Sequence, residues 1–145
     1  MPLQPSITRQ DVVDEARTWI GVPWVHGGRA RSGVDCAGLL HVVFSRFASL
    51  PPTPAYPIDF FLHRGDERFK DFVEQYAIYS PNTAPLPGDI CLYKVGRSLS
   101  HGAIVMWWPY VIHAWRLVER VICSESDRGE LGVRLAGVWR PTIWS

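Results

Sequence analysis

The spacing of apolar residues changes at about Pro81, and this change constrains the fold more than any other feature of the sequence. Before Pro81, apolar side chains recur every three or four residues, which is typical of helices. After it they fall in short alternating runs, which are typical of strands. The turns between these runs are too short for parallel crossovers, so neighbouring strands are expected to be antiparallel. The order predicts an α+β domain in which N-terminal helices pack on a C-terminal antiparallel sheet.

Helices are therefore expected in the first half of the chain and strands in the second. Thr8 is suited to cap the first helix, with Asp11 at its third position, and the helix is expected to run through Ile20. A second helix opens at Asp35 and Cys36, directly after a glycine-bearing loop. The spacing then predicts a third helix over about 66–79 and strands near 90–94, 101–107, 110–115, 120–123 and 133–140.

Composition and charge argue against several classes of function. The 145 residues are 47% hydrophobic, and 15 Lys and Arg face 14 Asp and Glu, a balance that does not favour a nucleic-acid partner. The longest apolar run is too short to cross a bilayer, and the first residues lack the pattern of a secretory signal. We therefore expect synthesis in the cytoplasm, no membrane insertion, and a single domain over residues 1–145, with the proline-rich stretch 50–57 as an internal loop.

Cys36 is the most informative position for chemistry. A thiol in the first turn of a helix feels the positive end of the helix dipole and unpaired N–H groups, and both favour the nucleophilic thiolate. The same N–H groups could hold an oxyanion. The alternative is a buried structural cysteine, and we expect that role for Cys91 and Cys123, which lie in strand-like runs. Three cysteines without a CxxC pair indicate neither a disulfide framework nor a structural zinc site.

Two histidines can be paired with this thiol by strand phase. His101 and His113 lie on consecutive predicted strands joined by the Trp108-Pro109 turn, so their imidazoles could meet across the sheet. If that sheet packs against the Cys36 helix, His101 could serve as general base and His113 could orient it. Taken separately, each histidine could instead be a surface or core residue. A zinc site formed by the same three side chains is a further alternative.

Five segments resemble, in order, motifs of the NlpC/P60 cysteine peptidases. They are Gly21-Val22-Pro23-Trp24-Val25-His26-Gly27-Gly28, Asp35-Cys36-Ala37-Gly38-Leu39, Leu86-Pro87-Gly88-Asp89-Ile90, His101-Gly102-Ala103-Ile104-Val105 and Ile112-His113-Ala114. The resemblance implies a papain-like fold in which Cys36 is the nucleophile, His101 the base and His113 the orienting third residue. It implies no metal or cofactor. The implied activity is hydrolysis of peptide bonds in peptidoglycan stem peptides, often the bond from γ-D-Glu to a diamino acid.

The short chain is most similar to the phage and prophage subgroup of this family, which implies tail or baseplate partners and a place in the virion. Three positions depart from the family pattern and concern the substrate: Trp24 stands where a tyrosine is usual, Ala37 replaces a serine, and His26 stands where a tryptophan is usual. Trp24 and Asp35 are the predicted substrate-binding residues, although Asp35 could simply cap its helix. The competing hypothesis is a structural tail or baseplate component whose peptidase activity is weakened or absent.

Overall fold

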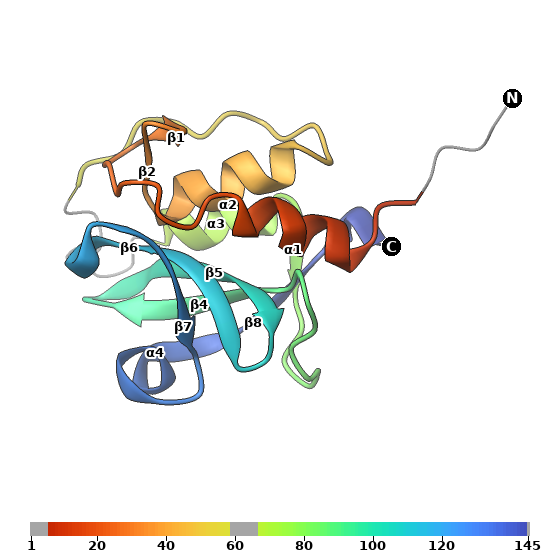
Figure 1. Ribbon diagram of the computed structural model, residues 1–145. Coiled ribbons are helices and arrows are strands. Elements are labelled where there is room, and N and C mark those ends of the chain that lie inside the picture. The colour runs from red at the N-terminus through yellow and green to blue at the C-terminus, as the bar shows by residue number, and fades with distance from the viewer. Residues whose placement is uncertain (1–5, 59–66, 145) are drawn as a thin grey trace, which may run out of the picture.

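The computed structural model describes residues 6–58 and 67–144, in which helices pack on an antiparallel sheet (Figure 1). In chain order the elements are α1 (Arg9–Arg17), β1 (Arg29–Ala30), β2 (Gly33–Val34), α2 (Cys36–Ser45), α3 (Arg68–Glu74), β3 (Ala77–Tyr79), β4 (Ile90–Val95), β5 (Ser98–Trp107), β6 (Tyr110–Trp115), β7 (Arg120–Glu125), α4 (Gly129–Arg134) and β8 (Leu135–Pro141). The main sheet has the order β3-β8-β4-β5-β6-β7, and every pair in it is antiparallel. The α+β prediction is confirmed.

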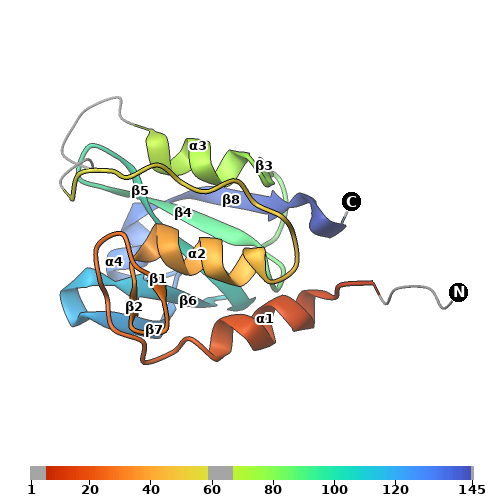
Figure 2. The ribbon, with the colours of Figure 1, turned by 90° about the horizontal axis from the view of Figure 1, so that it is seen from above.

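Helices α1, α2 and α3 cover one face of the sheet, and α4 lies at the other (Figure 1). Figure 2 shows α2 between α1 and α3, so that its first turn points toward the end of the sheet that carries β6 and β7. The larger core lies under these helices and includes Leu39, Val43, Ile104 and Ile112, all of them fully buried. This packing fixes α2 relative to β5 and β6.

The start of α1 follows the sequence pattern, while its end differs. Thr8 Oγ accepts from the Asp11 N–H at 3.0 Å, and the Asp11 carboxylate accepts from the Thr8 N–H at 2.9 Å, which completes the expected capping box. The helix ends at Arg17, short of Ile20, and the chain then turns through Gly21, whose φ of +94° lies in the left-handed region. Ile20 is 45% exposed, so its apolar character does not mark a buried helical face.

Glycine contacts bring the loop before α2, the helix itself and strand β5 close together. A Cβ added at Gly38 would lie 2.0 Å from the Gly28 carbonyl oxygen, and one at Gly28 would lie 2.3 Å from the Gly33 carbonyl oxygen. On β5, a Cβ at Gly102 would lie 2.9 Å from the Phe69 ring. Side chains at these positions would separate the backbones, so the glycines set the distance between the first turn of α2 and its neighbours.

Two predicted elements are wrong in part. The third helix was expected over about 66–79, and residue 66 lies outside the described residues; α3 ends at Glu74, and Ala77–Tyr79 forms the edge strand β3, paired with β8. The strand expected from 133 begins at Leu135, because Gly129–Arg134 is the helix α4. At 77–79, pairing with the distant strand β8 outweighs local apolar spacing, whereas residues 133 and 134 complete the helix α4. None of the helices in the described part of the chain is long and apolar enough to span a membrane.

Candidate active site

The sheet joins the two predicted histidines directly. His101 on β5 and His113 on β6 lie on one face of adjacent strands, with 2.8 Å between His101 Nε2 and His113 Nδ1. The Trp115 ring contacts both imidazoles edge-on or tilted, with centroids 4.7 Å from His101 and 5.4 Å from His113. Both side chains are buried. The prediction that the two imidazoles meet across neighbouring strands is confirmed.

Ser124 on β7 extends this pair, and the sequence analysis missed it. His113 Nε2 lies 2.8 Å from Ser124 Oγ, so His101, His113 and Ser124 form a hydrogen-bonded chain across three consecutive strands. The strand register accounts for this contact: His113 pairs with Ile122, and Ser124 is two residues further along β7. Side chains two apart on a strand share a face, so the register of β6 and β7 places Ser124 beside His113.

Cys36 is the first residue of α2 and faces the same cleft as His101. This cleft has a volume of about 500 Å³ and runs between the first turn of α2 and the end of the sheet. The Cys36 thiol donates to the Ser100 carbonyl oxygen at 3.5 Å, one residue before His101. Within residues 6–58 and 67–144, no hydrogen bond joins the thiol to His101, and His101 Nδ1 has no partner either. Of the ring nitrogens in the His101–His113 pair, His101 Nδ1 is therefore the one that can exchange a proton with a group in the cleft.

Burial keeps the thiol and both imidazoles uncharged at neutral pH. It raises the pKa of the Cys36 thiol, and the nearby Asp35 carboxylate adds to the rise, while backbone hydrogen bonds from Gly102 and Ala37 act in the opposite direction. Burial also lowers the pKa of His113 to about 4 and that of His101 well below its ordinary value. Burial and the Asp35 carboxylate therefore oppose the thiolate that the place of Cys36 at the helix N-terminus favours.

Asp35 is the N-cap of α2, and its carboxylate is saturated with hydrogen bonds. One oxygen accepts from the Gly38 N–H at 2.8 Å and from Arg29 Nη1 at 3.1 Å. The other accepts from the Gly27 N–H at 2.7 Å and from the Tyr56 hydroxyl. The residue is only 3% exposed. A substrate ammonium would have to displace one of these four donors, so the capping role is the one that the geometry displays.

Trp24 lines the cleft, and the Arg116 guanidinium lies 5.4 Å from the centre of its ring. Arg116 opens the short 3-10 turn Arg116–Val118 that follows β6. It is exposed and makes no salt bridge within the described residues. Arg134, also at the cleft, is instead paired with Glu130 at 3.0 Å. Arg116 is thus the cation that the cleft offers to a ligand.

The two remaining cysteines differ in their exposure to solvent. Cys91 is fully buried on β4, as expected, whereas Cys123 on β7 is exposed, so the prediction of a buried Cys123 is wrong. It lies on β7, an edge strand of the main sheet. No three His, Cys, Asp or Glu side chains in the described ranges are grouped so that they could hold a metal ion, and the zinc alternative finds no donor set there.

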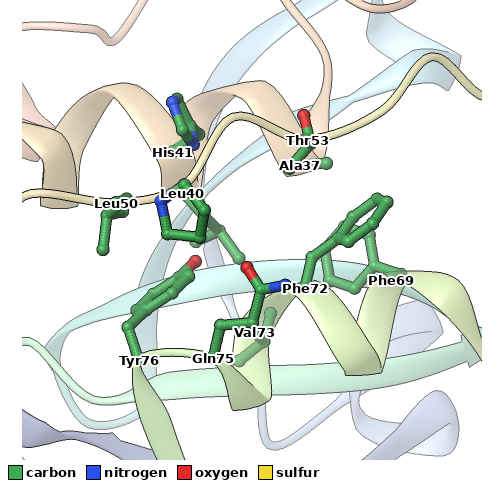
Figure 3. Close-up of a pocket in the computed structure, with 11 residues that line it drawn as sticks. Ala37, Leu40, His41, Leu50, Thr53, Phe69, Phe72, Val73, Gln75 and Tyr76 are labelled. Atoms are coloured by element: carbon green, nitrogen blue, oxygen red, sulfur yellow. The ribbon is translucent and has the colours of Figure 1, made fainter.

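A second hollow lies between α2, α3 and the loop that crosses above them (Figure 3). Figure 3 shows Leu40, Phe72, Val73 and Tyr76 turned toward one another around it. Its volume is about 10 Å³, which is at most the space of one water molecule. We treat it as a packing gap in the core, and the larger cleft beside Cys36 remains the candidate active site.

Comparison with known proteins gives a consistent result for the fold. The sequence profile of the NlpC/P60 family matches residues 21–140. No curated protein sequence matches the chain. Among solved structures, an NlpC/P60 family protein from Bacillus cereus superposes with a TM-score of 0.70 at 16% identity, over 92% of this chain and 40% of that one.

Two further solved structures share this fold. The NlpC/p60 domain of the peptidoglycan hydrolase SagA has a TM-score of 0.64 at 19% identity, and the match covers 94% of this chain and 100% of that domain. RipD from Mycobacterium tuberculosis has a TM-score of 0.61 at 12% identity, over 95% of this chain and 99% of that one. RipD is described as a non-catalytic NlpC/p60 domain protein adapted to peptidoglycan binding. These likenesses concern the papain-like fold.

Proposed function

The chain belongs to the NlpC/P60 family, and from this premise we propose that it is a cysteine peptidase that hydrolyses peptide bonds in peptidoglycan stem peptides. One observation carries the proposal: Cys36, at the N-terminus of α2, lines the same cleft as His101, whose Nε2 is held by His113 at 2.8 Å. The arrangement supplies a nucleophile, a base and an orienting group. The peptidoglycan hydrolase SagA, which has the same fold, supports this substrate class.

In the proposed mechanism, His101 Nδ1 takes the thiol proton as Cys36 Sγ attacks the carbonyl carbon of the scissile amide. Since both groups are neutral at rest, proton transfer accompanies the attack. Backbone N–H groups in the first turn of α2 stabilise the oxyanion. His101 then protonates the leaving amine, which departs and leaves a thioester on Cys36. Finally, water attacks the thioester with His101 as base and releases the free carboxylic acid.

The finer details of substrate and setting also belong to the proposal. We assign the bond from γ-D-Glu to the diamino acid as the bond that is cleaved, because its flanking carboxylates suit Arg116, which lies beside Trp24 and has no ion pair among the described residues. Asp35 has its four hydrogen bonds already, so we expect no need for a free ammonium next to it. We further propose that the protein acts on the cell wall from a phage tail, where tail or baseplate proteins are its partners.

A second candidate function is binding without hydrolysis, including a structural role in a tail or baseplate. The observation that favours it is the Cys36 thiol, whose pKa is raised and which donates to the Ser100 carbonyl oxygen rather than to His101. RipD is a precedent for this fold in a non-catalytic protein. Retention of both His101 and His113 in contact with each other is better explained by the peptidase.

Digestion of muropeptides with defined stem peptides tests these alternatives. The purified protein is incubated with stems that differ in diamino acid and in the presence of a free N-terminus, and the products are identified by mass spectrometry. We expect release of the diamino-acid fragment by the wild type and by Cys123→Ala, and none by Cys36→Ala. If the wild type and Cys36→Ala are equally silent on every stem while both bind it, the peptidase proposal is wrong and the binding function is supported.

A further inference from the structure

We propose that Ser124 is a positioning residue. It accepts a hydrogen bond from His113 and thereby holds His101 in the neutral tautomer that can act as a base. The inference rests on the proposed peptidase function. Its structural basis is the chain of two contacts, each of 2.8 Å, that joins His101 Nε2 to His113 Nδ1 and His113 Nε2 to Ser124 Oγ.

The direction of the hydrogen bonds follows from the chemistry required at the cleft. A neutral imidazole has one N–H donor and one bare acceptor nitrogen. His101 can take the Cys36 proton only if its Nδ1 is bare, so its own proton must sit on Nε2 and point at His113 Nδ1. His113 must then accept at Nδ1 and carry its proton on Nε2, which is the nitrogen that faces Ser124. Ser124 Oγ completes the chain as acceptor.

The reverse direction would disable the base. If Ser124 donated to His113 Nε2, His113 would donate from Nδ1 to His101 Nε2, and the His101 proton would sit on Nδ1 at the cleft. The thiol would then have no acceptor there. The same direction holds when His101 becomes an imidazolium during the attack. His101 then still donates from Nε2 to His113, and His113 still donates to the Ser124 oxygen. Both imidazoles are buried, so within the described residues the row His101–His113–Ser124 supplies their hydrogen-bond partners.

Variants at position 124 separate positioning from packing. We expect Ser124→Ala to lower kcat by about fivefold to tenfold with little change in KM, which is the fold-change of one lost hydrogen bond. Ser124→Thr keeps the hydroxyl and should restore most of kcat. Cys123→Ala is the matched control, since it lies next along β7, is exposed, and pairs with Ile112 on the opposite face from His113. A fall in kcat with Cys123→Ala of the same size would overturn the proposal.

A double-mutant cycle adds a readout that a general packing effect would not produce. Because Ser124 acts through His113, Ser124→Ala should change kcat in the wild type and leave it unchanged in a His113→Ala background. Equal fold-changes in the two backgrounds would contradict the proposal.

The closing experiment does not depend on activity. Nitrogen NMR of labelled histidines reports which ring nitrogen carries the proton, and we expect His113 to be protonated at Nε2 and His101 at Nε2 in the wild type and in Cys36→Ala. In Ser124→Ala, we expect a mixture of the two forms at His113. Protonation of wild-type His113 at Nδ1 would overturn the inference. Failure of the peptidase itself would appear separately, as an unchanged NMR result together with no hydrolysis of any stem peptide.

Discussion

The two walls of the cleft are built in different ways. The histidine wall consists of β5, β6 and β7, each of which contributes one polar side chain to a hydrogen-bonded row, and the strand register sets the spacing of that row. The thiol wall is the first turn of α2 and the loop before it, where the paired strands β1 and β2 have two residues each. There the geometry depends on Asp35, which joins Gly27, Arg29, Tyr56 and Gly38.

This difference indicates where the site can tolerate change. A sheet register is maintained by many backbone hydrogen bonds, so the loss of one side chain on the histidine wall should alter chemistry more than structure. The thiol wall gathers its hydrogen bonds on a single carboxylate, so the loss of Asp35 should alter structure first. Variants of both walls test that contrast.

Replacement of the nucleophile should abolish hydrolysis. Cys36→Ala is expected to reduce kcat by about 10⁴-fold or more, because no other group in the cleft can form the thioester. Initial rates of stem-peptide hydrolysis measure the change, and circular dichroism checks that the variant is folded. Cys123→Ala is the control for loss of a thiol that lies outside the cleft. Residual hydrolysis by Cys36→Ala at more than a few per cent of the wild-type rate would exclude Cys36 as nucleophile.

Removal of the Asp35 charge should weaken the fold. Asp35→Asn leaves Arg29 without its buried ion-pair partner and replaces an acceptor oxygen with a donor, which we expect to cost about 4 kcal/mol in the free energy of unfolding. Urea denaturation measures it. Asp11→Asn at the exposed cap of α1 is the matched control, with an expected loss of about 1 kcal/mol or less. Equal losses for the two caps would break the contrast between the walls.

The buried imidazoles should make stability fall with acidity. The pKa of His113 is lowered to about 4, so below its ordinary value of about 6.5 the unfolded chain binds a proton that the folded chain does not. Protonation of this group in the unfolded chain leaves the free energy of unfolding unchanged above about pH 6.5. Between pH 6.5 and pH 4 it lowers that free energy by on the order of 3 kcal/mol. Urea denaturation at pH 7 and pH 5 measures the slope. His113→Asn should flatten it and His26→Asn, at an exposed position, is the control; identical slopes in wild type and His113→Asn would refute the assignment.

Loss of the exposed cation should give the smallest effect. Arg116→Ala is expected to raise KM for anionic stem peptides by about threefold to tenfold with kcat nearly unchanged, as for a contact made equally in the ground and transition states. The effect should diminish at high salt. Arg134→Ala, which removes a cation already paired with Glu130, should raise KM less. The same increase for both variants would show that Arg116 has no particular role.

The sequence predicted one wall better than the other. Strand alternation placed His101 and His113 together, because a two-residue period leaves only one choice of face once the turn is short. It missed Ser124, which requires knowledge of how β6 and β7 are registered. The thiol wall could be predicted only as far as the Asp35 cap. Its bonds to Tyr56 and Arg29 join residues 21 and 6 positions away in the sequence, and the path of the chain to Tyr56 follows from contacts that no local pattern encodes.

The stacked glycines under the thiol wall limit how this domain could diversify or be redesigned. Gly28, Gly33 and Gly38 leave no room for a Cβ, so a library of variants at these three positions would consist mostly of misfolded protein. Exposed positions that line the cleft, such as Ile58 and Leu117, face no such restriction. New ligand preferences should therefore be sought by randomising the exposed lining, with the three glycines held constant as the scaffold.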